Sequence, residues 1–175
     1  MKGELDLMTP GMKVQDELMN GAAPEVIFQG EYATEWTAVN NFKKVLIMLL
    51  GSAAQQAMSG KLDLKGEQEL LMNLADIIIE IFNTESTLMR VQKIAENHPE
   101  KNLDVYNAIL ETLMHDATGR ITKQATDAIA SFIAPEMQPA FISGLRKFTK
   151  YPLQNIKEKR RKIAEELIKS AEYCF

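Results

Sequence analysis

The chain has 175 residues, of which 46% are hydrophobic and 25% are charged, a composition that is typical of one soluble globular domain and excludes a mainly disordered protein. Cys174 is the only cysteine, which excludes a disulfide scaffold, and the net charge of −4 argues against a nucleic-acid-binding protein. The sequence shows no targeting segment and no stretch of about 20 apolar residues that could span a membrane. We therefore expect a cytoplasmic protein.

The first 30 residues are predicted to form an N-terminal connector arm. Thr9 as N-cap and Pro10 at the first helical position predict a short helix, which Gly21 would end. A small apolar group follows at residues 26–28, and the sequence does not decide whether it docks on the helices that follow or on domains absent from this chain. The rest of the chain, residues 31–175, is predicted to be one helical bundle domain.

Three long helices are predicted from apolar residues that recur every three or four positions in a chain rich in Leu, Ala, Met, Glu and Lys. Gly60 ends the first of them, and Pro99 ends the second because the residue before a proline avoids the α region. In the second helix, the apolar positions form one wide stripe: Leu70, Leu71, Leu74, Ile77, Ile78 and Ile81. The predicted ranges are residues 32–59, 66–97 and 103–133.

Two shorter helices are predicted near the C-terminus. One covers residues 139–148, and the other begins at Asn155, which together with Glu158 has the spacing of a capping box. Its apolar face contains Ile163, Leu167 and Ile168. Short connections place successive helices antiparallel. The predicted fold class is therefore all-α: an up-and-down helical bundle of three long helices plus the C-terminal helix, with an N-terminal arm.

No pattern of residues is typical of a catalytic or metal centre. A di-metal site in a bundle needs Glu-x-x-His pairs, and this chain has two histidines, of which His115 is followed by Asp116 without a second histidine nearby. Asp76 and Glu80 share a helix face and offer a carboxylate pair for acid–base chemistry. The solvated side of an amphipathic helix explains them better. We therefore predict no catalytic, cofactor-binding or metal-ligating residue in this chain.

The most pronounced charge feature is the C-terminal segment, residues 145–175, which carries 9 basic and 4 acidic residues. A basic helix can bind an anionic membrane surface, a phosphate-bearing ligand or an acidic protein. It can also be simply a solvated helix face with pairs such as Lys162–Glu166, and this interpretation is favoured. Nucleic acid fits poorly because no aromatic residues lie between the cations. The candidate surface for an anionic partner consists of Lys157, Lys159, Arg160, Arg161 and Lys162.

Six segments of the chain carry a resemblance to a known family: residues 2–5 (KGEL), 67–80 (EQELLMNLADIIIE), 85–91 (ESTLMRV), 146–150 (RKFTK), 160–164 (RRKIA) and 173–175 (YCF). Together they resemble the appended C-terminal helical domain of the long-chain and very-long-chain type acyl-CoA dehydrogenases. The resemblance extends over nearly the whole chain and contains no short catalytic motif.

The resemblance implies a non-catalytic part of a longer enzyme of fatty-acid β-oxidation, which oxidises acyl-CoA thioesters to 2-enoyl products. Such enzymes use FAD, a glutamate base and an electron-transferring flavoprotein, and this machinery lies in upstream domains. No residue of this chain matches it, so the resemblance implies no cofactor here and FAD in the parent enzyme. The implied partners are the missing dehydrogenase domains of the same polypeptide and a second subunit of a homodimer.

Within such an enzyme, the domain would stabilise the core, mediate subunit contacts or hold the enzyme peripherally at a membrane surface. The alternative is a free-standing helical adaptor, which binds a protein or an anionic membrane through its basic C-terminal helix. The sequence leaves both interpretations open.

Overall fold

The structure is a computed structural model that describes residues 8–19, 26–98 and 101–172. The described residues form six α-helices and no strand, which confirms the all-α class and the bundle with an N-terminal arm. The predicted stop at Gly21 lies outside the described residues. The helices are α1 (Met8–Met19), α2 (Ala33–Met58), α3 (Gln68–Asn97), α4 (Leu103–Phe132), α5 (Gln138–Phe148) and α6 (Ile156–Ser170).

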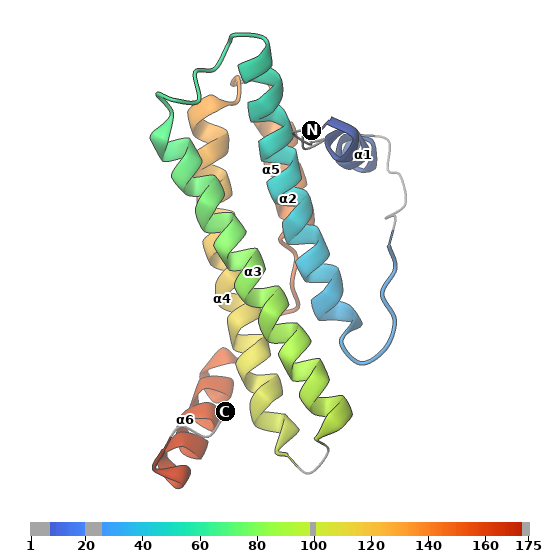
Figure 1. Cartoon of the computed structure of the whole chain (residues 1–175), viewed down its shortest axis with the longest axis vertical. Helices are drawn as coiled ribbons and strands as arrows, with labels where there is room; N and C mark the ends of the chain where they lie inside the picture. Colours follow the sequence, from blue (N-terminus) through green and yellow to red (C-terminus); the bar gives the residue numbers. More distant parts are fainter. Residues whose placement is uncertain (1–7, 20–25, 99–100, 173–175) are drawn as a thin grey trace, which may run out of the picture.

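Helices α2 to α5 run alternately up and down around a common core (Figure 1). α3 packs on α2 and α4, while α5 packs on the same two helices. α5 therefore takes the fourth position in the bundle, and α6 packs on α4 alone. The core consists of large side chains that are almost completely buried, among them Phe42, Leu49, Leu70, Ile77, Leu88, Leu110, Met114, Ile121, Ile129, Leu145 and Phe148.

The helix ends follow the predicted signals closely. Gly60 lies just beyond α2 with a φ of 71°, a left-handed conformation that favours glycine. The Asn155 side chain accepts a hydrogen bond from the backbone N–H of Glu158 at 3.4 Å and caps α6 as predicted. Asn102 occupies the N-cap of α4, but its side chain makes no capping hydrogen bond. For α2 to α5 and for the start of α6, backbone signals thus predicted the helix ends within about two residues, the usual precision of such boundaries.

Two of the predicted apolar faces are only partly buried. On α3, Leu71 and Ile78 are 44% and 47% exposed, because this helix contacts α2 and α4 on one side only. On α6, Ile168 is 79% exposed, because the helix packs on a single neighbour. Both helices therefore present apolar side chains to solvent.

The N-terminal segment contacts the bundle at two places. α1 packs against α2, where Val14 and Glu17 are buried. Farther along, the Phe28 ring stacks on the Trp36 ring at a centroid distance of 5.9 Å, whereas Ile27 is exposed. Phe28 therefore docks on this chain's own helices. None of the described helices has the length and apolarity that crossing a bilayer requires.

Candidate interaction surfaces

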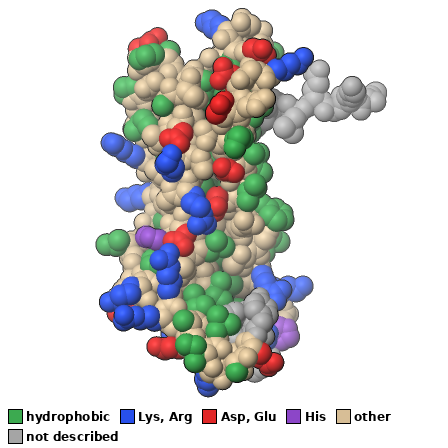
Figure 2. All heavy atoms as spheres, turned by 90° about the vertical axis from the view of Figure 1, so that its left-hand side faces the viewer, with side chains coloured by type: hydrophobic (Ala, Val, Ile, Leu, Met, Phe, Trp, Pro, Cys, Tyr) green, Lys and Arg blue, Asp and Glu red, His purple; other side chains and the backbone are tan. Residues whose placement is uncertain are grey.

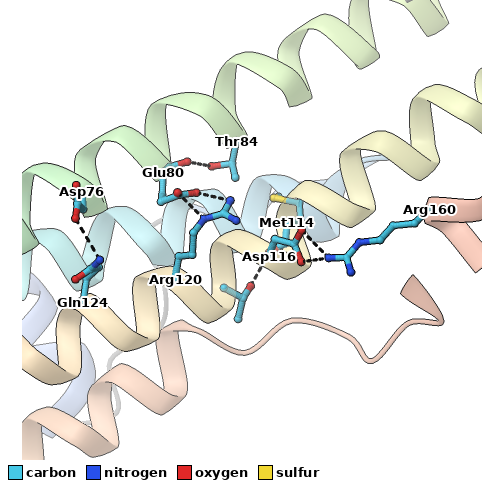
Figure 3. Close-up of polar contacts among 9 residues, drawn as sticks. Asp76, Glu80, Thr84, Met114, Asp116, Arg120, Gln124 and Arg160 are labelled. Carbon is cyan, nitrogen blue, oxygen red and sulfur yellow. Dashed lines mark hydrogen bonds and ion pairs between the residues drawn. The ribbon is translucent and has the colours of Figure 1, made fainter. Parts of the chain in front are cut away.

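A row of polar contacts crosses the outside of the bundle from α3 to α4 (Figure 3). The Arg120 guanidinium donates two hydrogen bonds to the Glu80 carboxylate, at 2.6 and 2.8 Å. One turn farther along, the Gln124 amide donates to Asp76 at 3.2 Å. The hydrogen bond to Glu80 is the main reason that the pKa of Arg120 is raised above its usual value. Asp76 and Glu80, the predicted carboxylate pair, thus fasten α3 to α4.

The row continues from α4 to α6 through the contact between Asp116 and Arg160. One terminal nitrogen of Arg160 donates to both oxygens of Asp116, at 2.7 and 2.8 Å (Figure 3). Asp116 is the neighbour of His115 that the sequence singled out, and His115 itself is exposed. Of the His-Asp dipeptide, Asp116 therefore binds α6, and His115 is a surface residue.

The five predicted anionic-partner residues of α6 divide into two groups. Lys159 forms an ion pair with Glu111, and Lys162 pairs with Asp104 at 3.1 Å, so these two and Arg160 all bind carboxylates of α4. Lys157 and Arg161 form no ion pair with any residue that the structure describes. Figure 2 shows basic side chains gathered mainly over the lower half of this face. Three of the five candidate cations are therefore neutralised by carboxylates of the chain itself.

A buried charge cluster attaches α1 to the bundle, and the sequence analysis did not find it. Glu17 forms an ion pair with Lys44 of α2 at 2.6 Å, with both side chains only 11–12% exposed. Lys147 of α5 donates to the backbone oxygen of Glu17 at 3.1 Å. Lys44 and Lys147 both lie over the Phe148 ring, at 5.4 and 5.6 Å from its centroid. One acidic side chain of α1 thus joins two other helices.

Gly144 on α5 leaves space for the side chain of Leu18, the residue that follows Glu17 on α1. A Cβ atom at Gly144 would lie 2.8 Å from Leu18 Cδ1 and 3.2 Å from Met48 Sδ. Next to this contact, α1, α2 and α5 enclose a groove of about 360 Å³. The sequence contained one signal for this contact: Val14 and Leu18 are four residues apart and so share a helix face.

The outer face of α3 has more exposed large apolar side chains than any other described helix. Single exposed apolar residues are normal, whereas a contiguous patch marks an interaction site. Figure 2 shows hydrophobic side chains along the right-hand edge of its view. Six large apolar side chains of α3 are between 44% and 68% exposed: Leu71, Met72, Ile78, Ile79, Phe82 and Met89.

The carboxylates described above bind partners within the chain. The described residues contain no group of three or more His, Cys, Asp or Glu side chains that could hold a metal ion. Glu80, Asp116 and Glu17 each bind a cation of the chain itself. Among the described residues, the surfaces left open include the apolar face of α3 and the α6 cations Lys157 and Arg161.

Comparison with known proteins identifies the class of this fold. The family model described as "Acyl-CoA dehydrogenase, C-terminal domain" matches residues 41–147. The chain belongs to this family, which confirms the resemblance; the very-long-chain type stays a prediction.

The chain spans less than a third of the length of two relatives that it matches. A probable acyl-CoA dehydrogenase of Bacillus subtilis (strain 168) is 30% identical over 174 residues, which make up 99% of this chain and 28% of the relative. The crystal structure of an acyl-CoA dehydrogenase complexed with FAD from Bacillus anthracis matches all of this chain with a TM-score of 0.86 and 30% identity. The chain covers 29% of that structure. The likeness therefore includes α1 and α6, which lie outside the family match.

Proposed function

We propose that this chain is the non-catalytic helical domain of a flavin-dependent acyl-CoA dehydrogenase, and that it stabilises the catalytic part and its subunit contacts. The membership in the C-terminal domain family supports this role most directly. The exposed apolar face of α3 agrees with it, because a domain that packs against further protein leaves such a face open when seen alone.

We place the FAD outside this chain. The diphosphate of a dinucleotide needs cations or free backbone N–H groups. In this chain Arg160, Lys159 and Lys162 are bound to α4 carboxylates, and Arg120 is bound to Glu80. These residues do not fit a flavin site. The chemistry of FAD, the oxidation of an acyl thioester, then belongs to the upstream domains of the parent enzyme.

A chimera with the Bacillus subtilis relative tests this role. The relative is truncated before the segment that aligns with this chain, and this chain is then fused in its place. We expect the truncated enzyme to melt at a lower temperature and to lose FAD on dilution, and the fusion to restore both properties. A fusion with an unrelated helical bundle of similar length is the control.

Two results would contradict the proposal. One is a chimera that is no more stable and retains no more FAD than the truncated enzyme. The other is a purified sample of this chain alone that shows a flavin absorption band and oxidises acyl-CoA. Either result would require a different function for the bundle.

The second candidate is a peripheral contact of α6 with an anionic surface, which Lys157 and Arg161 would make. Its support is weaker, because the other three cations bind α4. Co-sedimentation with anionic vesicles at low and high salt tests it, since an electrostatic contact is screened by salt. We expect the chain to stay in the supernatant. Binding at low salt that the double variant K157A/R161A loses would favour the membrane role.

A further inference from the structure

The exposed face of α3 contains a heptad seam. Met72, Ala75, Ile79, Phe82, Ser86 and Met89 follow one another at intervals of three and four residues, and all six are exposed. This alternation is the spacing of the a and d positions through which two helices pair in a coiled coil. We refer to these six residues as the outer seam. At about 1.5 Å per residue, it extends over roughly 26 Å of the helix.

The outer seam points away from the bundle's own core. Ile77 and Leu88, which are completely buried, lie on the opposite side of α3. In Figure 1 no other helix lies in front of α3. A helix that is apolar on two opposite sides needs a second partner to remove the outer side from water.

The side-chain sizes along the outer seam are symmetric about a point between residues 80 and 81. From either end of the seam towards its middle, the order is the same: a large residue, a small residue and a large residue. Turning a second copy by 180° brings Met72 opposite Met89, Ala75 opposite Ser86, and Ile79 opposite Phe82. These are the layers that two antiparallel copies of one helix would form, with the small residues allowing close approach.

The charges beside the outer seam favour the same arrangement. Glu69, Asp76, Asn83 and Arg90 occupy one flanking heptad position, seven residues apart. In an antiparallel pair, equal flanking positions meet, so Glu69 faces Arg90 of the second copy and Asp76 faces Asn83. The two helix dipoles also oppose each other in this orientation. In a parallel pair, these positions would instead meet the other flanking heptad position, so Glu69 and Arg90 would not face each other.

We propose that the outer seam of α3 pairs with the outer seam of a second copy of this chain in an antiparallel, two-fold symmetric contact. The contact is a subunit interface and so rests on the proposed role of the domain in subunit contacts. On α2, Leu46 and Leu50 lie on the same side as Lys43, which pairs with Glu85 of α3, and they are partly exposed. They extend the apolar surface beside the seam.

Sedimentation velocity of the full chain over a wide concentration range is the first test. We expect a reversible monomer–dimer equilibrium that I79E shifts towards monomer, with the dissociation constant raised at least about tenfold. Ile168→Glu is the matched control, because Ile168 is 79% exposed on α6 and lies outside the seam. Circular dichroism checks that each variant remains folded.

Charge reversal distinguishes a specific contact between two copies from non-specific association through the apolar surface. We expect E69R alone and R90E alone each to weaken the dimer by a few-fold, since exposed pairs contribute less than about 1 kcal/mol each. The combination E69R/R90E should restore the wild-type dissociation constant, because it re-creates the pair with reversed signs. Only a contact between copies of the same chain gives this rescue.

Disulfide trapping measures the orientation. In a C174S background, a mixture of one chain carrying A75C and another carrying S86C should form a cross-linked dimer, because disulfides need Cα atoms within about 7 Å. Each single variant alone should stay uncross-linked in an antiparallel pair. Cross-linking of S86C alone would show a parallel pair and would overturn the proposal.

Two further results would overturn the proposal: a chain that is monomeric at every concentration, and a dimer that I79E leaves unchanged. Neither would affect the proposed role in stabilising a dehydrogenase, which the chimera measures through melting temperature and FAD retention. A monomeric chain that stabilises the chimera would instead assign the seam to the catalytic part.

Discussion

The first and last helices are attached to the bundle in opposite ways. α1 inserts Leu18 against Gly144 and buries Glu17 between Lys44 and Lys147. α6 buries only Ile156 and is held by ion pairs at the surface. The N-terminal helix thus depends on shape and on desolvated charge, whereas the C-terminal helix depends on screened charge.

This difference predicts how each helix responds to its surroundings. A buried ion pair is strongly destabilised by the loss of one partner, because the other charge stays in a poorly solvated place. An exposed pair contributes little and weakens with added salt. α1 should therefore unfold with the bundle, while α6 should detach on its own at high ionic strength.

The largest expected effect comes from removing the carboxylate of α1. Glu17→Ala leaves Lys44, only 12% exposed, without its partner. We expect the free energy of unfolding to fall by about 3 kcal/mol or more, measured by urea denaturation. Asp127→Ala is the control, because it removes the well-exposed pair with Lys123 and should cost less than about 1 kcal/mol. Equal losses in the two variants would contradict a buried role for Glu17.

A somewhat smaller effect is expected at the close contact between α5 and α1. Gly144→Val places side-chain atoms where Leu18 lies and should destabilise the protein by about 1–2 kcal/mol through overpacking. Hydrogen exchange should show that residues 8–19 lose protection before α2 does. Gly119→Val is the control, since no atom lies within 4 Å of a Cβ added there. Unchanged protection of α1 in Gly144→Val would show that α1 docks by other contacts.

A still smaller effect on global stability is expected for α6. The triple variant K159A/R160A/K162A removes the ion pairs to α4 and should reduce global stability by less than about 1 kcal/mol per pair. Exchange protection over Ile156–Ser170 should nevertheless fall, and in the wild-type chain it should fall with added salt. The double variant K157A/R161A is the control. Salt-independent protection of α6 would show that apolar packing holds the helix.

The sequence predicted the backbone better than the contacts. Helix ends depend on local chemistry, so Gly60 and Asn155 could be recognised without any neighbour. Burial depends on which helix packs where, so the exposure of Leu71 and Ile78 could not be predicted from their periodicity. The wide stripe on α3 contained two faces, and only one of them belongs to this bundle.

The charged sites illustrate the same limit. Helical spacing showed that the α6 cations could form pairs within the helix, but the structure pairs Lys162 with Asp104 across 58 residues. The docking of Glu17 on Lys44 depends on a tertiary contact that no local pattern contains. Charge patterns marked the α6 cations as a candidate surface for an anionic partner, and the fold shows that three of them bind carboxylates of α4.

The smallest effect at neutral pH concerns the segment that links the bundle to α6. The Tyr151 hydroxyl donates to Glu35 at 3.1 Å, and burial, followed by the negative charge of Glu35, raises the pKa of Tyr151 well above its ordinary value of 10.0. Burial also raises the pKa of Tyr32. The folded protein therefore keeps these protons when the unfolded chain has released them.

It follows that the stabilising contribution of Tyr151 is complete below about pH 10 and decreases as the pH rises further. Urea denaturation from pH 8 to 11 should show a free energy of unfolding that falls above about pH 10. Y151F should make this fall less steep, and Y32F/Y151F should flatten it more. An equal slope in the wild type and Y151F would mean that Tyr151 ionises in the folded protein as freely as in the unfolded chain. In that case the segment around Tyr151 would be no better fixed to the bundle than α6 is.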